Sequence, residues 1–271
     1  MKDAGAMNEA KLPPNLETTD VGGVRTLWLN RPELHNAFDE ALIASLTAAV
    51  EHAGADEAVR VLVLAGRGRS FCAGGDLNWM LRAAKHTPEQ NLADARLLAK
   101  LFQTVSDCPK PVLARVQGNA LAGGTGLVAA CDLVVADTTA RFGTTEVRIG
   151  LVPGTIAPYL VRAIGARAAS RYFLTGERFS AAEAHRLGLV HELCAPEELD
   201  TVVARQVTAL LAGGPESLRE AKALLRHVSG RVIDAELLEE TAQWIARVRG
   251  TTEAQEGLTA FLAKRPPAWL P

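Results

Sequence analysis

The sequence predicts an α/β core followed by a helical C-terminal region. Strand and helix patterns alternate up to about residue 194, whereas the chain from about residue 196 onward is helical and charged. The run VRVLVLAG is apolar without interruption, which is typical of a strand covered on both faces. A chain of 271 residues is long enough for one large domain, or for one domain with a smaller appendage.

The first elements follow from apolar spacing and from the residues that end each pattern. A strand is expected from about Val24 to Leu29, where Pro32 stops it. Asp39 is a typical N-cap for the next helix, which is expected to end at Gly54. The apolar face of this helix consists of Leu42, Ile43, Leu46, Ala49 and Val50.

The middle of the chain contains further strands and helices. After the loop RSFCAGGDLNWM, apolar residues from Leu92 to Val105 indicate an amphipathic helix. The sequence CPKP ends this helix, because a residue before proline avoids helical geometry. PVLARVQG and DLVVAD are the next strands, with a glycine-rich stretch and a helix between them, and ARFGTTEVRIGLVPG follows.

The core is expected to end in a helix and a short strand, and a helical C-terminal region is expected to follow. Ser180 and Glu183 have the spacing of a capping box, which predicts a helix up to Gly188, and GLVHELC is the last short strand. Three helical stretches follow, PESLREAKALLRHVSG, DAELLEETAQWIARVRG and TTEAQEGLTAFLAKRPPAWLP. We therefore expect a polar N-terminal extension over residues 1–18, an α/β core over residues 19–195 and a helical region over residues 196–271.

Composition excludes several classes of protein. The net charge of −2 and the lack of an Arg/Lys stripe with interleaved aromatics argue against nucleic acid and anionic membranes as partners. No apolar run approaches the roughly 18–20 residues that span a bilayer, and the N-terminus lacks the apolar stretch of a secretory signal. The four cysteines have no metal-like spacing. A cytoplasmic protein with reduced thiols and no metal is expected.

Two loops share one pattern, in which an apolar strand is followed by small residues and then a helix. The first loop is Ser70–Asp76 and the second is Gly118–Thr125. Such turns expose unpaired N–H groups at a positive helix end, and two of them together form an oxyanion hole for a carbonyl that gains charge. Close packing of helix on sheet explains the same glycines equally well. Neither loop is a nucleotide-binding fingerprint.

At this point the motifs amount to a family resemblance. RSFCAGGDLNWM, VQGNALAGGTGLVAACDLVVAD, ARFGTTEVRIGLVPG, FLTGERFSAAEAHRLGLVHEL and AFLAKRPP, in this order, resemble the crotonase family of enoyl-CoA hydratases and isomerases. The resemblance implies a spiral of ββα units with a helical trimerisation region, and homotrimers or homohexamers. It also implies an acyl-CoA substrate whose enolate is held by two backbone N–H groups, with no cofactor beyond the CoA that the substrate carries.

The resemblance assigns roles to particular residues. The two N–H donors would be those of Gly75 and Gly123, and Phe261 and Lys264 would touch the nucleotide end of CoA, sometimes that of a neighbouring subunit. Without the resemblance, these two would be read as a core phenylalanine and a surface lysine. The substrate-contacting positions that it implies are Ala73, Gly75, Asp76, Leu77, Asn78, Gly123, Gly126 and Gly154.

One departure from the family pattern concerns the acids. Family hydratases use two glutamates; here the later one is kept as Glu146, but Gly126 stands where the earlier one is expected. A single carboxylate favours an isomerase, since moving a proton between carbons needs only one base. In a hydratase, another polar residue would hold the water. The candidates for that role are Asn78, Thr125, Thr144, Thr145 and Thr155.

A finer resemblance favours hydration. AGGDLNWM, NLADARLLAKL and TEVRIGLVPGTIAPYLVRAIG resemble bacterial 3-methylglutaconyl-CoA hydratases, whereas two-glutamate hydratases carry PGAGGT where this chain has PGTIAP. Arg82 and Lys85 are the candidate partners of a distal carboxylate, unless they form a solvated helix face. Hydration of an enoyl-CoA, with 3-methylglutaconyl-CoA as the candidate substrate, is therefore the first hypothesis. The alternatives are a Δ3,Δ2-isomerase with Glu146 as its sole acid/base, and a non-catalytic CoA-ester or RNA-binding protein.

Overall fold

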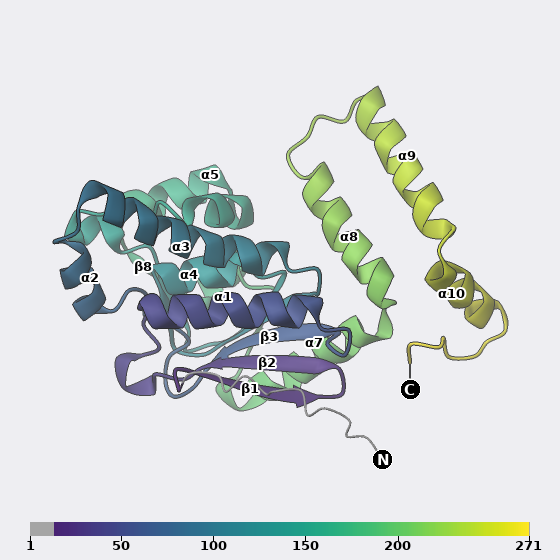
Figure 1. Cartoon of the computed structure of the whole chain (residues 1–271), viewed down its shortest axis with the longest axis horizontal. Coiled ribbons are helices and arrows are strands. Elements are labelled where there is room, and N and C mark those ends of the chain that lie inside the picture. The colour runs from purple at the N-terminus through teal and green to yellow at the C-terminus, as the bar shows by residue number, and fades with distance from the viewer. Residues whose placement is uncertain (1–13, 271) are drawn as a thin grey trace, which may run out of the picture.

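The computed structural model describes residues 14–270, in which two β-sheets are surrounded by helices (Figure 1). The larger sheet has the strand order β1-β2-β3-β4-β6-β9, and the smaller sheet has the order β5-β7-β8. The larger sheet consists of β1 (Leu16–Val21), β2 (Val24–Leu29), β3 (Val61–Gly66), β4 (Val112–Val116), β6 (Leu133–Asp137) and β9 (Glu192–Cys194). The smaller sheet consists of β5 (Asn119–Leu121), β7 (Arg141–Gly143) and β8 (Arg178–Ser180).

Helices lie between the strands, and every regular element described after β9 is helical. They are α1 (Glu40–Ala55), α2 (Leu77–Ala83), α3 (Pro88–Asp107), α4 (Gly123–Ala130), α5 (Ala157–Thr175), α6 (Ala181–Arg186), α7 (Leu199–Ala212), α8 (Pro215–Val228), α9 (Ala235–Arg249) and α10 (Thr252–Leu262). Three 3-10 turns are η1 (Pro32–Leu34), η2 (Glu146–Ile149) and η3 (Pro196–Glu198). The expected α/β core with a helical C-terminal region is confirmed.

The larger sheet is covered on both faces, as the apolar run in β3 predicted. Leu62 and Leu64 belong to the main core, which includes the buried faces of α1, α3 and α4. Val61 and Val63 point the other way and pack in a second cluster with residues of α7. The strands from β2 to β9 run parallel to their neighbours, so neither face of the central strands is left to solvent.

Strand β1 is a correction to the expected boundaries. It pairs antiparallel with β2 in a hairpin turned by Gly22 and Gly23, whose φ angles are positive. The last residues of the expected extension, residues 16–18, therefore lie in the sheet, and residues 1–13 are outside the described part of the chain. The strand LETTDV is an edge strand with polar side chains, so its apolar pattern is too weak to reveal it.

Helix caps behave largely as the sequence predicted. Asp39 caps α1 by accepting a hydrogen bond from Leu42 N at 2.8 Å. Ser180 accepts from Glu183 N at 3.2 Å, but the Glu183 carboxylate turns instead to Tyr172 and Arg186, so only half of the expected capping box forms.

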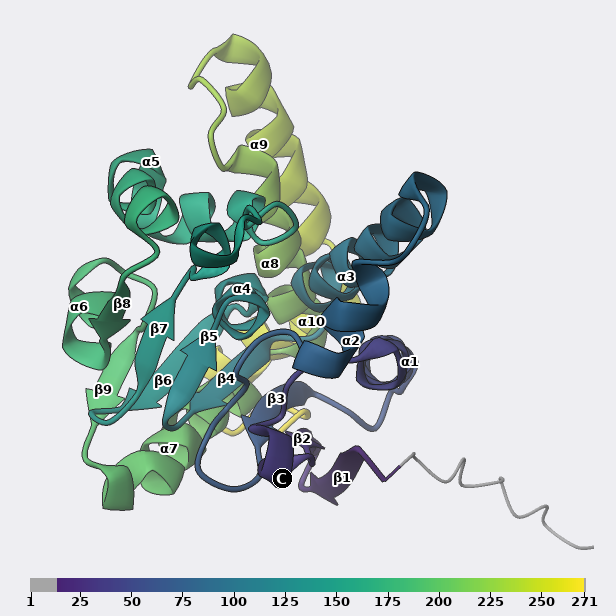
Figure 2. The ribbon, with the colours of Figure 1, turned by 90° about the vertical axis from the view of Figure 1, so that its left-hand side faces the viewer.

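Helix α5 has no counterpart among the expected elements. Its residues continue through Gly165, which has φ 75° and ψ 154° and divides the helix at a kink. The buried residues are Leu160 and Ile164 before this glycine and Ala169 and Tyr172 after it, so the spacing of three or four residues is broken at the kink. Figure 2 shows α5 and α6 on one side of α4, with α1, α2 and α3 on the other.

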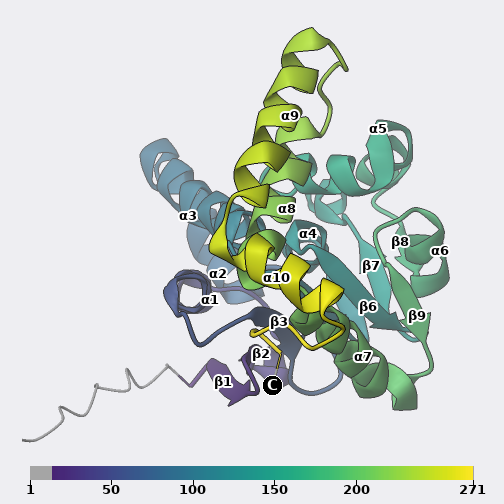
Figure 3. The ribbon, with the colours of Figure 1, turned by 90° about the vertical axis from the view of Figure 1, so that its right-hand side faces the viewer.

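The C-terminal helices extend from the core at the end opposite α2 (Figures 1 and 3). Helix α8 is attached by Lys222, whose ammonium group lies 2.6 Å from Asp132 and 3.2 Å from the Lys110 carbonyl. After α10, the chain returns to α7, where Trp269 Nε1 donates to the Ala212 carbonyl.

No helix within residues 14–270 has the length and apolar character needed to cross a membrane. The same residues contain no cluster of three or more histidine, cysteine or acidic side chains able to hold a metal ion. The four cysteines are buried and unpaired.

Candidate active site

The two glycine loops lie side by side. Loop 1 (Ser70–Asp76) pairs with the start of loop 2 (Gly118–Thr125), since Cys72 N donates to Asn119 O and Leu121 N donates to Cys72 O. The other edge of loop 1 is held by Phe38, whose N–H donates to Gly74 O at 2.7 Å. The structure therefore brings together the two loops that the sequence singled out by pattern.

Glycine is required where the loops touch. Gly74 has φ 96°, and a Cβ there would lie 2.9 Å from Ala122 Cβ and 3.0 Å from Leu121 O. A Cβ on Gly124 would lie only 2.2 Å from Cys72 O. Both sets of distances are shorter than van der Waals contact, so these two glycines serve close packing.

The neighbouring glycines, Gly75 and Gly123, present free N–H groups. Within residues 14–270, neither amide donates to a protein acceptor, and both residues are partly exposed. Gly123 is the first residue of α4, so its N–H also lies at the positive end of that helix. Ala122 precedes it with φ 48° and ψ −118°, a strained conformation for a residue with a Cβ. Such strain is a known feature of functional turns and fixes the direction of the Gly123 N–H.

Glu146 lies on the segment that follows β7, next to loop 2. Strand β7 pairs with β5 in register Leu121↔Gly143, and Ala122 N donates to Gly143 O at 2.7 Å. Three residues later, Glu146 begins η2, and its Oε2 is buried without a hydrogen-bond partner among the described residues. Burial raises the pKa of this carboxyl above its usual value of 4.5. A half-buried carboxylate with a raised pKa and one unpartnered oxygen is suited to accept and return a proton.

Asp76 has a structural role at the end of loop 1. Its carboxylate caps α2 by accepting from Asn78 N at 2.8 Å and Trp79 N at 3.2 Å, and it pairs with Arg31 at 3.1 Å. Burial alone would raise its pKa, but the two backbone N–H groups and the Arg31 guanidinium hold the pKa below its usual value. Asp76 is thus an ionised residue that orients the loop, while Leu77 and Asn78 are exposed beside it.

Gly126 and Gly154 are placed in different surroundings. Gly126 is buried in the first turn of α4, facing Ile156 and Phe102. Gly154 is exposed and, with Thr155, borders a cavity of about 590 Å³ between α3, α5 and α8.

Hydrogen bonds inside the fold remove two of the five candidates for holding a water molecule. Thr125 Oγ1 donates to Ala120 O at 2.6 Å and accepts from Gly143 N, so it is fully used inside the fold. Thr144 Oγ1 is buried and donates to Tyr172 O. The candidates that are not buried are Asn78, Thr145 and Thr155.

The four other predicted contact residues are exposed in the single chain. Arg82 is exposed and paired with Glu40, and Lys85 is exposed on the turn after α2. Phe261 is 80% exposed on α10, and Lys264 follows that helix in the sequence. Helix α10 lies at the end of the molecule opposite α2 (Figure 1). In a single chain, Phe261 and Lys264 therefore do not approach loop 1.

The structure adds residues that the sequence patterns did not single out. A Cβ on Gly75 would lie 3.3 Å from Met80 Sδ and 3.6 Å from the Trp79 ring, so these side chains border Gly75. The indole Nε1 of Trp79 is buried and has no partner among the described residues. The only available signal was their position in the helix directly after loop 1.

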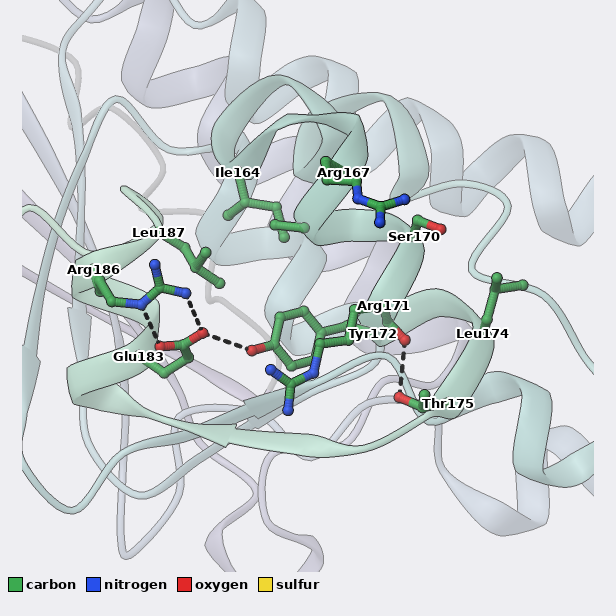
Figure 4. A pocket seen from close by; sticks show the side chains of 11 residues that line it. Ile164, Arg167, Ser170, Arg171, Tyr172, Leu174, Thr175, Glu183, Arg186 and Leu187 are labelled. Carbon is green, nitrogen blue, oxygen red and sulfur yellow. Dashed lines mark hydrogen bonds and ion pairs between the residues drawn. The ribbon is translucent and has the colours of Figure 1, made fainter.

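A separate cavity of about 670 Å³ lies between α5 and α6 and contains none of the expected site residues (Figure 4). Its floor is the Glu183 carboxylate, which accepts from Arg186 and from the Tyr172 hydroxyl. The Arg186 and Tyr172 hydrogen bonds lower the pKa of Glu183 to about 2. This acid is therefore a permanently ionised structural partner and does not suit proton transfer.

Known proteins with similar sequences and structures point to one family. The sequence model described as enoyl-CoA hydratase/isomerase matches residues 19–270. The 2,3-dehydroadipyl-CoA hydratase of Escherichia coli is 36% identical over 90% of this chain and 94% of that protein. The trans-2-decenoyl-[acyl-carrier-protein] isomerase of Streptococcus mutans is 32% identical over 90% of this chain and 94% of that protein. A crystal structure of an enoyl-CoA hydratase from Shewanella pealeana has a TM-score of 0.93 at 42% identity, covering 96% of this chain and 97% of that one. The fold expected from the sequence motifs is confirmed.

Proposed function

Because the chain belongs to the enoyl-CoA hydratase/isomerase family and is an enzyme of that family, we propose that it adds water across the 2,3 double bond of an enoyl-CoA thioester. The observation that carries this proposal is the half-buried Glu146 carboxylate, whose Oε2 is buried without a hydrogen-bond partner among the described residues, on the segment after the strand paired with loop 2. The Gly75 and Gly123 N–H groups support it, because they are free beside that segment.

In the proposed reaction, the thioester oxygen accepts hydrogen bonds from the Gly75 and Gly123 N–H groups. Glu146 takes one proton from water while the water oxygen bonds to Cβ, and the π electrons move toward the thioester to form an enolate. The two N–H groups stabilise the charge on the enolate oxygen. The protonated Glu146 then gives its proton to Cα, and the enolate collapses. One water is added and the carboxylate is regenerated.

Substitution of Glu146 by glutamine tests the assigned role. Gln keeps the shape of the side chain but removes the base, so we expect kcat to fall by about 10²- to 10⁴-fold while CoA-ester affinity stays within twofold. Glu57→Gln changes an exposed carboxylate outside the site and serves as the matched control. Unchanged turnover in the Glu146 variant would refute the role, and wild-type protein that binds CoA esters without turnover would be a binding protein.

An isomerase is the second candidate, because one carboxylate also suffices to move a proton between C4 and C2. One relative is itself named an isomerase. The two functions are separated by incubating the protein with 3-methylglutaconyl-CoA, crotonyl-CoA and a 3-enoyl-CoA in turn. A mass gain of one water supports hydration, whereas a 2-enoyl product of unchanged mass from the 3-enoyl ester alone would establish the isomerase.

For the substrate, we propose an enoyl-CoA with a distal carboxylate, with 3-methylglutaconyl-CoA as the candidate. The cavity beside Gly154 and Thr155 supports this class, because Arg162 borders it. Arg162 Nη2 donates to a hydroxyl, Ser106 Oγ at 3.3 Å, and within residues 14–270 the guanidinium pairs with no carboxylate. One relative is named for 2,3-dehydroadipyl-CoA, a thioester of a dicarboxylic acid with one free distal carboxylate.

Arg162→Gln tests the substrate class. Loss of one charged hydrogen bond should lower kcat/KM for 3-methylglutaconyl-CoA by about 10- to 100-fold, and it should leave crotonyl-CoA nearly unaffected. Arg82→Gln is the control, since Arg82 is already paired with Glu40. An equal loss on both substrates, or a selective loss with Arg82→Gln, would contradict the assignment.

The chain is also proposed to assemble as a trimer or hexamer through its C-terminal helices. Apolar side chains on and between these helices are at least half exposed, among them Leu225, Val232, Ile233, Ile245 and Phe261. An interface over them would also let Phe261 and Lys264 reach the CoA of a neighbouring copy. Analytical ultracentrifugation should give three or six times the chain mass of 28.8 kDa, and a monomer would refute this assembly.

A further inference from the structure

We propose that Ile156 occupies the space of a side chain at position 126 and thereby restricts the site to a single carboxylate. A Cβ added to Gly126 would lie 2.1 Å from Ile156 Cγ2 and 2.7 Å from Ile156 Cβ. Phe102 closes the same space, with its Cζ 3.4 Å from that position. The steric part of this inference stands on the packing alone, and its catalytic part rests on the function proposed above.

Rotation of the isoleucine does not relieve the overlap. A change of χ1 moves Cγ2, but Ile156 Cβ is fixed to the backbone and would stay 2.7 Å from the new atom. Ile156 is only 2% exposed and lies at the N-cap of α5, where its carbonyl accepts from Leu160 N. Phe102 is fully buried and packs edge-on against Phe38. A side chain at position 126 therefore requires movement of α4 or α5.

Movement of α4 would disturb the proposed oxyanion donor. Gly126 N donates to Ala122 O at 3.1 Å, in the first turn of the helix that begins with Gly123. Displacing this turn changes the direction of the Gly123 N–H. The packing between Gly126 and Ile156 consequently positions Gly123 as well as excluding a second acid.

The two positions differ in size in opposite senses. Position 126 is a glycine on α4, and position 156 is an isoleucine at the N-cap of α5. A large residue at the start of α5 therefore accompanies the small residue on α4. Gly126 is one half of a matched pair, so converting the site to two carboxylates requires changes at both positions.

A stability cycle tests the steric part without any turnover. Gly126→Ala is made in the wild-type chain and in the Ile156→Gly variant, which lacks both Cγ2 and Cβ, and thermal unfolding of all four proteins is measured. The added methyl group should lower the unfolding midpoint by roughly 3–10 °C when Ile156 is present and by much less in the Ile156→Gly background, so the two changes should be non-additive. Equal losses in both backgrounds would overturn the proposal.

A second experiment tests the catalytic part. Gly126→Glu is combined with Ile156→Gly, and the control replaces Glu by the uncharged isostere, Gly126→Gln with Ile156→Gly. We expect crotonyl-CoA hydration by the Glu variant to exceed that of the Gln variant at least tenfold, with a second carboxylate visible in the pH–rate profile. The gain should be absent when Ile156 is kept, and an equal gain with Ile156 present would refute its role.

The outcomes separate the two proposals. If neither wild type nor variants change any enoyl-CoA, the proposed function fails, but the stability cycle still decides whether Ile156 blocks position 126. If wild type turns over and the cycle is additive, the function stands and the role of Ile156 is wrong.

Discussion

The contact between the two glycine loops leads to a prediction about Gly74→Ala. Gly74 has φ 96°, and its new methyl group would press on Ala122 Cβ at 2.9 Å and on Leu121 O at 3.0 Å. A Cβ in left-handed backbone costs about 1–2 kcal/mol, and overpacking adds about 1–3 kcal/mol, so the free energy of unfolding should fall by about 2–5 kcal/mol. The overlap should also push Gly75 away from Gly123. Misplacing one oxyanion donor costs about 10²–10³ in kcat.

Gly230→Ala is the matched control for this variant. Gly230 has φ 76° between α8 and α9, and a Cβ there meets no atom within 4 Å. It should therefore lose only the backbone term, about 1–2 kcal/mol, and retain its kcat. Urea unfolding gives the free energies, and single-turnover hydration gives the rates. A folded Gly74→Ala protein with wild-type kcat would refute the view that loop contact sets the donor geometry.

Two further predictions concern charge. Because burial raises the folded-state pKa of Glu146, its ionisation opposes folding at neutral pH; Glu146→Gln should therefore raise the unfolding midpoint at pH 7 and have no effect below about pH 4, where the carboxyl is protonated in both states. The increase in the unfolding midpoint should grow as pH rises through the raised pKa of Glu146. An increase that is the same at every pH would show that the buried charge is not its cause. Lys222→Met leaves Asp132 without the ammonium group that pairs with it. Because Asp132 keeps some contact with water, we expect the free energy of unfolding at pH 7 to fall by about 3 kcal/mol, the low end for a broken buried pair. Asp132→Asn in the same chain should restore part of that loss, and urea unfolding that shows no recovery would mean that Lys222 acts through packing alone.

Local patterns predicted the parts of the fold that local physics determines. The apolar run of β3 indicated a strand covered on both faces, and Asp39 indicated the start of α1; the structure confirms both. Strand β1 was missed because an edge strand carries polar side chains, and α5 was missed because Gly165 divides its apolar face. Both misses concern elements whose stability comes from tertiary contacts, which a short window of sequence does not contain.

The candidate site was likewise only partly predictable from the sequence. Loop 1, loop 2 and Glu146 were expected from motifs, and strand pairing in the structure places them on adjacent segments. The contact between Gly126 and Ile156 joins two segments that are far apart in the sequence, so no pattern along the chain reveals it. The roles of Thr125 and Thr144 were also beyond prediction, because each hydroxyl is used by a backbone group from another segment.

The glycines of the two loops were open to two explanations, close packing and oxyanion binding, and the geometry divides these between neighbouring residues. Gly74 and Gly124 have no room for a Cβ, whereas Gly75 and Gly123 directly beside them keep N–H groups without an acceptor in the described chain. Each packing glycine thus fixes the backbone that aims the adjacent N–H. A backbone donor has no side chain to remove, so its role is tested through the contact that positions it. For this reason the packing variants at Gly74 and Gly126 are more direct tests of the proposed oxyanion hole than any substitution at Gly75 or Gly123 itself.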